Sequence, residues 1–347
     1  MSVNSARYEN LDYLRGLCAL SILCYHYIGW VFSGLDASTF LGKLGVYGVS
    51  IFYVLSGLTM YLVYFKNFNL DSAFFKNFYI KRIFRIFPLM WLVILLNFLL
   101  RGYHSTLQKD LLNFSGLFSV FNWTASLPLG MWSIGNELSF YFTLPVLFFC
   151  MKQGKIFTLL ISIVVFGIYF YFAFFILDKS NPISVQDNPY KNPLNQMGLF
   201  FGGILIGHFF KAREFKNIIV LSILIISLLA FYFYPSHGNA INIIVGYERI
   251  IFTLLCFTIT LGFFKSNLNF LPFFLKRRLT FLGKISYSLY LIHGLVFYAF
   301  TLTGLKIRYV LPLSVAATFA CSWLIFIILE SPARKLGVKL TERLAYK

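Results

Sequence analysis

Residues 11–32, LDYLRGLCALSILCYHYIGWVF, decide how the rest of the chain is interpreted. The run is long enough to cross a bilayer, which takes about 20 apolar residues. It nevertheless contains Asp12, Arg15 and His26, and such groups are costly in hydrocarbon unless they face a protein interior or a watery cavity. Arg15 and His26 are eleven residues apart, so they share one helix face about 16 Å apart, and Asp12 precedes Arg15 on that face. The stretch predicts a transmembrane helix that lines a polar path.

Composition indicates a polytopic membrane protein. Aromatic residues make up 20% and charged residues only 12% of the 347 residues, and the mean hydropathy is +0.76, which excludes an ordinary soluble domain. The net charge of +18 would suggest a nucleic-acid partner in a soluble protein. Here the basic residues sit in short loops between apolar segments, so we expect a lipid bilayer and no nucleic acid as the environment of the chain. The five cysteines lie in or beside apolar runs without metal-type spacing and are interpreted as buried hydrophobes.

Ten apolar segments predict an all-α, polytopic transmembrane helical bundle of about ten spans. With the amino terminus inside, the inside loops hold 21 lysine and arginine residues and the outside loops hold 8, which predicts that both termini are cytoplasmic. We interpret residues 1–347 as a single integral membrane domain without a fused soluble domain. The sixth segment is rich in glycine, so it is either closely packed or the weakest of the ten. The segments are 11–32, 44–65, 84–100, 131–150, 156–177, 196–210, 217–235, 248–264, 285–303 and 309–329.

His26 is the candidate catalytic group of the first segment. It lies about four turns into the span, whereas Arg15 is only one turn inside and would be explained by a side chain that reaches back to the interface. Histidine accepts and returns a proton near neutral pH, which suits it to act as a general base on a hydroxyl. We therefore favour a functional role over simple packing for His26.

Basic residues gather before the third segment. Lys81 with Arg85, and Arg82 with Arg85, share a helix face, and Pro88 suits the first turn of a helix that begins near residue 84. Two interpretations fit this stretch. Anchoring to anionic lipid is the simpler one, and a clamp for phosphate is the functional one, because guanidinium groups make bidentate contacts.

Acidic side chains occur at two later span ends. Glu137 lies one to two turns into the fourth segment, four residues after Ser133 on the same face, and a carboxylate at that depth needs a partner or a watery cavity. Glu330 lies at the predicted cytoplasmic end of the last segment, just before Pro332, where it could pair with an arginine of an inside loop.

The ninth segment carries the second candidate histidine within a span. Ser286, Tyr290 and His293 fall near one helix face, although interfacial tyrosines are ordinary membrane anchors. The remaining histidines, His104, His208 and His237, fall at loops or span ends, and we assign them no role.

In combination these motifs resemble the acyltransferase-3 family of integral membrane acyltransferases, whose members O-acetylate bacterial surface sugars. The resemblance covers nearly the whole chain, and its six motifs occur in the expected order. Two departures are Ser50, where many relatives have an acid, and Leu138 after Glu137, where many have glutamine, so that Glu137 is the one candidate carboxylate of its motif. The matching residues are Arg15 with His26, residues 52–58 (FYVLSGL), Arg82 with Arg85 and Pro88, Trp132, Ser133 and Ile134 with Glu137, Ser286, Tyr287, Tyr290, Leu291 and His293, and Glu330 with Pro332.

The resemblance implies a bacterial inner-membrane O-acyltransferase with a cytoplasmic acyl-CoA donor, acetyl-CoA above all. The acceptor would be a hydroxyl of a cell-surface or exported carbohydrate, lipid-linked or free. Arg82 and Arg85 would hold the phosphates of CoA with Arg15 at the entrance, and His26 would be the general base. Glu137 or Asp12 would orient the imidazole, and depth favours Glu137. Supporting roles fall to Asp12, Ser133, Tyr287, His293 and Glu330, and no metal is implied.

Two other functions stay open at this point. A transporter or flippase for a glycolipid or polysaccharide would also place charges inside the membrane, although we find no internal repeat. A catalytically inactive partner subunit is the third interpretation, and the intact motif residues count against it. The acceptor sugar, the acyl group, direct or covalent transfer, and homo-oligomer formation are open as well.

Overall fold

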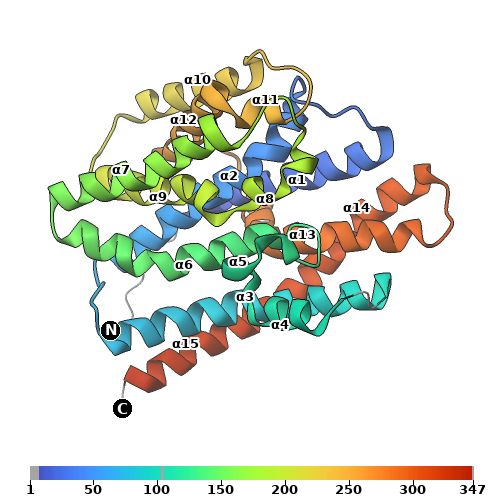
Figure 1. The fold of residues 1–347 in the computed structure, drawn as a ribbon, viewed down its shortest axis with the longest axis horizontal. Coiled ribbons are helices and arrows are strands. Elements are labelled where there is room, and N and C mark those ends of the chain that lie inside the picture. The colour runs from blue at the N-terminus through green and yellow to red at the C-terminus, as the bar shows by residue number, and fades with distance from the viewer. Residues whose placement is uncertain (1–7, 103–104, 346–347) are drawn as a thin grey trace. The chain divides into compact units, whose positions relative to one another are not determined.

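The structure is a computed structural model that describes residues 8–102 and 105–345 (Figure 1). Every regular element in these ranges is helical, so the predicted all-α fold class is confirmed. The ten predicted apolar segments all fall on helices. These are α1 (Glu9–Phe32), α2 (Phe40–Met60) with the π turn η1 (Tyr61–Phe65), α3 (Ser72–Arg101), α6 (Met131–Lys152), α7 (Lys155–Tyr171) with the π turn η3 (Phe172–Ile176), α9 (Pro193–Phe210), α10 (Asn217–Phe233), α12 (Gly246–Lys265), α13 (Phe273–Thr301), and α14 (Ile307–Ile325) with the π turn η5 (Phe326–Glu330).

Shorter helices complete the described chain. They are α4 (Leu107–Ser115), α5 (Phe118–Phe121), η2 (Trp123–Ala125), η4 (Ile183–Val185), α8 (Asp187–Lys191), α11 (Ile241–Ile244) and α15 (Ser331–Ala345). Three of them, α4, α5 and η2, lie between the third and fourth predicted segments. The buried Asn113 holds these pieces together, since its Nδ2 donates hydrogen bonds of 2.9 Å to the carbonyls of Lys109 and Ala125.

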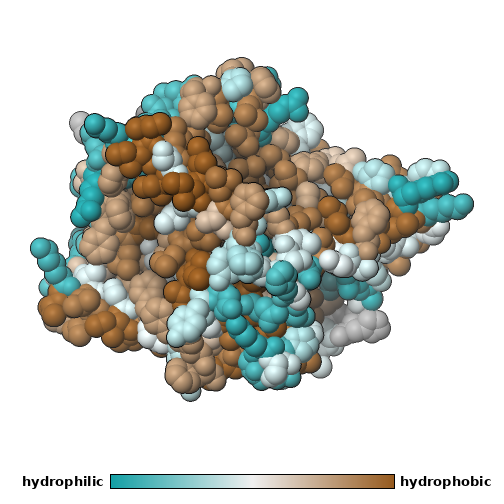
Figure 2. Space-filling view, turned by 90° about the horizontal axis from the view of Figure 1, so that it is seen from above, coloured by the Kyte–Doolittle hydropathy of each residue, from teal (hydrophilic) through white to brown (hydrophobic). Residues whose placement is uncertain are grey.

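The longer helices have the length and the surface that a bilayer requires. Eight helical stretches of the described chain are long and apolar enough to cross a membrane, and α10, with 17 residues, is a shorter apolar helix. The 18-residue α9 is not among these nine. Large hydrophobic side chains such as Ile163, Leu229 and Leu313 are exposed on them. Figure 2 shows such side chains, in brown, over much of the face in view. Exposed apolar surface of this extent fits contact with lipid.

Two helices begin about three turns before the apolar segments that predict them. α3 begins at Ser72 and not near 84, and α13 begins at Phe273 and not near 285. The added turns are rich in lysine and arginine, which lower hydropathy although both are good helix formers. The Asp71 carboxylate fixes the start of α3, because it accepts a 2.6 Å hydrogen bond from the Phe74 N–H.

The predicted positions of two prolines relative to the helix ends are wrong. Pro88 lies inside α3, not in its first turn, so the basic residues before it project from a helix and not from a loop. The last helix does not end at Glu330, since η5 leads directly into α15 and Pro332 lies in the first turn of α15. In a regular α-helix the ring of Pro332 would clash with the carbonyl four residues earlier, and the wider π turn relieves that clash.

The described chain forms two compact units, and α6 and α13 contribute residues to both. The first unit comprises the described parts of 1–66 and 146–284. Within it α2 packs against α1, α9 and α12, and α10 packs against α12. Lys43, which directly precedes the second predicted segment, is buried in the first turn of α2, and its Nζ donates to the carbonyls of Tyr232 and Tyr234 at the carboxyl end of α10.

Glycines bring α2 and α9 of the first unit into backbone contact. A Cβ atom placed on Gly57 would lie 1.8 Å from the Phe200 carbonyl oxygen, and one on Gly203 would lie 2.0 Å from the Val54 carbonyl oxygen. The glycine-rich sixth segment is thus closely packed, which is one of the two possibilities that its sequence left open. The FYVLSGL motif supplies the matching surface on α2.

The second unit comprises the described parts of 67–145 and 285–347. Its α3 packs along α15, as Figure 1 shows, and Gly337 of α15 leaves space for Phe84 of α3. The remaining motif side chains of this unit lie on α6 up to Pro145 and on α13 from Ile285 onward.

Candidate active site

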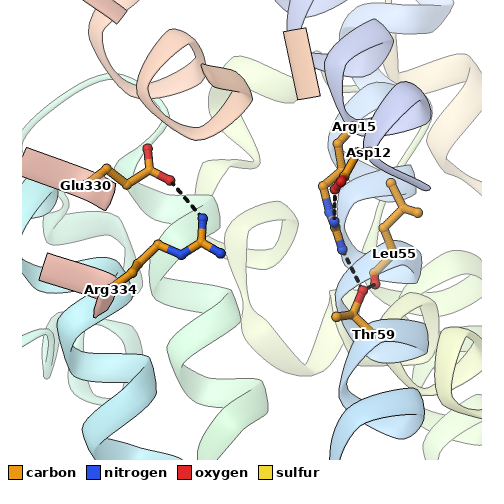
Figure 3. A network of polar contacts seen from close by, with 6 residues as sticks. All are labelled: Asp12, Arg15, Leu55, Thr59, Glu330 and Arg334. Atoms are coloured by element: carbon orange, nitrogen blue, oxygen red, sulfur yellow. Dashed lines mark hydrogen bonds and ion pairs between the residues drawn. The ribbon is translucent and has the colours of Figure 1, made fainter. Parts of the chain in front are cut away.

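Arg15 of α1 is held by two polar partners within the first unit (Figure 3). Its Nη1 lies 2.9 Å from Oδ1 of Asp12, and its Nη2 donates a 2.5 Å hydrogen bond to Thr59 Oγ1 on α2. Thr59 in turn donates to the Leu55 carbonyl one turn earlier. The guanidinium is therefore positioned by α2 as well as by its own helix. Both charged side chains are mostly buried, with 19% of Arg15 and 14% of Asp12 exposed.

A second glycine contact fixes the backbone beside this ion pair. A Cβ on Gly16 would lie 2.7 Å from the Gly283 nitrogen, and a Cβ on Gly283 would lie 2.3 Å from the Asp12 carbonyl oxygen. The first turns of α13 therefore cross α1 at the Asp12–Arg15 turn. This contact explains why glycine stands just before the ninth predicted segment.

His26 lies eleven residues beyond Arg15 on α1 and is half-buried. Its imidazole stacks on the indole of Trp30, with ring centroids 5.2 Å apart and an angle of 22° between the planes. Tyr25 meets the same imidazole edge-on at 5.1 Å. The His26 imidazole therefore contacts two aromatic rings of its own helix.

Glu137 of α6 lies in a group of aromatic and basic side chains within the second unit. The Tyr141 hydroxyl, one turn later, donates a hydrogen bond to the Glu137 carboxylate. The buried Tyr141 ring also faces Arg82 of α3, whose Cζ lies 5.6 Å from the ring centroid. Tyr79 of α3 donates to the Tyr141 carbonyl at 3.5 Å. The α3–α6 contact thus brings a carboxylate, a phenol and a guanidinium together.

Glu330 is a buried carboxylate at the end of η5, with 5% of its surface exposed. Its Oε2 accepts a 3.0 Å hydrogen bond from Ser288 of α13, and its Oε1 lies 3.9 Å from Arg334 Nη1 on α15 (Figure 3). Arg85 of α3 also interacts electrostatically with this carboxylate and with the Tyr287 phenol. The predicted pairing of Glu330 with an arginine is present, but Arg334 supplies it from a helix.

These side chains form one cluster, because Tyr141 and Tyr287 each interact electrostatically with both Glu137 and Arg85. We call it the arginine–glutamate cluster. It contains three guanidinium groups and two carboxylates, so it carries an excess positive charge and can attract an anion. Its charged members are Arg82, Arg85, Arg334, Glu137 and Glu330.

Glu330→Ala is expected to destabilise the protein, because it removes a buried carboxylate that accepts a hydrogen bond from Ser288 and interacts electrostatically with Arg85 and Arg334. Loss of a hydrogen bond to a charged group costs about 1.5–3 kcal/mol. Arg334→Ala removes a contact of 3.9 Å whose arginine side chain is 47% exposed, and exposed pairs contribute about 1 kcal/mol or less. Midpoints of thermal denaturation of the purified variants measure the difference. Equal losses in the two variants would contradict this assignment.

The tryptophan–serine motif and the tyrosine–histidine motif meet in the second unit. Ser133 Oγ of α6 lies 2.8 Å from the Tyr290 hydroxyl of α13, and both groups approach the carbonyl of Gly130. The buried His293 places Nδ1 2.6 Å from the Tyr290 carbonyl, which only accepts, so Nδ1 carries the proton and Nε2 is the basic nitrogen of the neutral ring. Gly130 has φ of +79°, and a Cβ there would lie 3.2 Å from the Tyr290 ring.

A family comparison decides what kind of protein carries these side chains. The family model described as an acyltransferase domain matches residues 8–327. The chain belongs to the acyltransferase-3 family. No curated protein and no solved structure matches it. The chain is therefore a multi-pass membrane acyltransferase, and the resemblance seen in its motifs is confirmed.

The acyltransferase distributes its predicted site residues over both units. Asp12, Arg15 and His26 lie on α1 of the first unit. That Glu137 orients the His26 imidazole stays a prediction. The Asp12 carboxylate forms an ion pair with Arg15. The residues of the second unit are Arg82, Arg85, Ser133, Glu137, Tyr287, His293 and Glu330.

Sequence reasoning missed the polar partners of several motif residues. Tyr141 and Arg334 each follow a motif glutamate by four residues, and that helical spacing is a usable signal. Thr59 and Ser288 bind across helices, so nothing in their local sequence marks them. In the described part of the acyltransferase, no three His, Cys, Asp or Glu side chains are grouped to hold a metal ion.

Proposed function

We propose that this acyltransferase transfers an acyl group, acetyl in the first place, from cytoplasmic acyl-CoA to a carbohydrate hydroxyl. The acceptor is a cell-surface or exported carbohydrate, and the enzyme resides in the bacterial cytoplasmic membrane. The observation that carries the proposal is the arginine–glutamate cluster in a chain of this family. Its excess guanidinium charge suits the phosphates of CoA, because arginine binds phosphate in a bidentate manner.

In the proposed reaction His26 is the general base. Its imidazole takes the proton of the acceptor hydroxyl while the oxygen attacks the thioester carbonyl carbon. A C–O bond forms, the C–S bond breaks, and the imidazolium returns the proton to the departing CoA sulfur. The Trp30 ring stacked on His26 supports this role, since it stabilises the transient positive charge.

Arg15 has a separate part in the proposal, at the donor entrance. The distance of about 16 Å along α1 from Arg15 to His26 is what an extended pantetheine arm requires. Asp12 and Thr59 hold the guanidinium in place, so it needs no reorganisation when the donor arrives. Asp12 is thereby a positioning residue for Arg15.

Equilibrium binding of CoA to the purified protein tests the donor assignment. We expect saturable binding that falls as ionic strength rises, because phosphate contacts are screened by salt. Absence of CoA binding would contradict the proposal and would favour the transporter or flippase interpretation, which gives the protein no reason to bind CoA.

The double variant Arg82→Ala/Arg85→Ala is expected to weaken CoA binding by at least about tenfold, because each charge-assisted contact contributes about 1.5–3 kcal/mol. Lys81→Ala is the matched control. It removes a cation of the same helix stretch that has no part in the arginine–glutamate cluster. The same titration measures both proteins. Equal effects would favour the interpretation that these basic residues anchor the helix to anionic lipid.

A further inference from the structure

Arg249 is a buried arginine that the proposed reaction does not use. It lies in the first turn of α12 in the first unit, and only 4% of it is exposed. Its Nη2 donates a 2.8 Å hydrogen bond to the Asn195 carbonyl, and its Cζ lies 4.0 Å above the Tyr169 ring. Its Nη1 is also buried and has no hydrogen-bond partner within the described ranges of the chain.

Among the residues that the structure describes, no carboxylate forms an ion pair with Arg249. Its neighbour Glu248 pairs with Lys179 at 2.9 Å, and Asp187 pairs with Lys191 at 2.5 Å. A buried charge without a counter-ion is strongly unfavourable, so such a group within a membrane protein indicates a functional site.

The surroundings of Arg249 add to its positive potential. The amino-terminal turn of α12 holds Arg249, and the amino-terminal turn of α9 holds Asn195, so the positive ends of two helix dipoles lie at this site. Asn195 is fully buried and its Nδ2 donates to the Tyr190 carbonyl at 3.0 Å. Its Oδ1 is buried and has no hydrogen-bond partner in the part of the chain that the structure describes, so the site also offers an acceptor for a hydroxyl.

We propose that Arg249 is an oxyanion-recognition site for a carboxylate or phosphate group carried by the carbohydrate acceptor. In this site Nη1 donates to the oxyanion, and Asn195 Oδ1 accepts a neighbouring sugar hydroxyl. The charge distribution predicts that this end of the first unit faces outside, where an exported acceptor would arrive. Shielding from water strengthens the interaction. The inference rests on the proposed function, and it narrows the acceptor to anionic carbohydrates.

The test uses the purified full chain in phosphatidylcholine nanodiscs and follows the midpoint of thermal denaturation. Glucuronate and glucose 6-phosphate are the anionic probes, and glucose and sodium chloride at matched ionic strength are the controls. We expect both anionic probes, and neither control, to raise the midpoint. A titration with CoA runs in parallel, so that failure of the donor proposal is seen separately from failure of this site.

Arg249→Gln is expected to weaken the binding of the anionic probes by at least about tenfold, since a charged donor is lost. Its response to CoA should be unchanged. Arg101→Gln is the matched control, because it removes an arginine that stacks on Tyr298 with its Cζ 4.3 Å from the ring centroid but is exposed. If Arg249→Gln does not fold, Arg249→Lys, which keeps the positive charge, replaces it in the same titration. We expect Arg249→Lys to bind the anionic probes more weakly than the wild type does.

Three outcomes would overturn the inference. The first is a wild-type protein that responds to neither anionic probe. The second is a variant at Arg249 that responds as the wild type does. The third is a thermal midpoint that rises, in a manner dependent on Arg249, when phosphatidylglycerol is added to the nanodisc but not when either anionic sugar is added. The oxyanion would then belong to a lipid headgroup and not to the acceptor.

Discussion

His26→Ala is expected to abolish acyl transfer while the protein stays folded and still binds CoA. General acid–base catalysis contributes about 10²- to 10⁴-fold, and without a base the acceptor hydroxyl is a poor nucleophile at neutral pH. The imidazole is half-buried and stacked on Trp30, so its removal leaves the backbone contacts of α1 intact. Transfer of labelled acetyl from acetyl-CoA measures activity, and CoA binding with the thermal midpoint reports on the fold.

His208→Ala is the matched control for this experiment. His208 is also half-buried in the first unit, and its Nδ1 lies 3.3 Å from the Tyr61 hydroxyl. We expect this variant to keep its activity, because His208 has no place in the proposed reaction. Full activity in His26→Ala would refute the general-base role. Loss of CoA binding in His26→Ala would assign His26 to donor binding and not to proton transfer.

The helices were predictable from sequence because hydropathy and length report directly on what a bilayer requires. All ten apolar segments fall on helices, and even the short, glycine-rich sixth segment is α9. The starts of α3 and α13 were not predictable in this way. Hydropathy measures the preference for lipid, whereas a helix begins where a cap such as Asp71 satisfies its first N–H groups.

The candidate site was predictable only where its contacts are local. Asp12 and Arg15 are three residues apart on one helix, and their ion pair is present. Thr59 reaches Arg15 from 44 residues away, and Ser288 reaches Glu330 across 42 residues. Such pairs depend on which helix faces pack together, and periodicity identifies a face without naming its neighbour.

The structure changes the interpretation of Arg82 and Arg85 more than that of the other site residues. As loop residues at a span mouth they would be ordinary anchors to anionic lipid. On α3 the Arg82 guanidinium lies over the Tyr141 ring, and Arg85 interacts electrostatically with the Glu330 carboxylate. Fixed guanidinium groups bind a phosphate with less loss of side-chain entropy than mobile loop residues do, so the helical placement favours the phosphate clamp over the lipid anchor.

Gly203→Ala is the second prediction with a large effect, and it is expected to destabilise the first unit. A methyl group there would lie 2.0 Å from the Val54 carbonyl oxygen, and the overlap is with backbone, so α2 and α9 must separate. Overpacking typically costs about 1–3 kcal/mol or more, whereas alanine in a helix gains about 1 kcal/mol over glycine. The packing loss outweighs the helical gain, and the thermal midpoint should fall.

Gly167→Ala provides the matched control, because Gly167 lies on α7 of the same unit and nothing comes within 4 Å of its added Cβ. There the helical gain acts alone, so we expect the midpoint to stay the same or rise. Gly203→Ala should also weaken CoA binding, since a shift of α2 moves Thr59, which holds Arg15. A lowered midpoint with unchanged CoA affinity would show that α2 packing matters for the fold but does not position Arg15 for the donor.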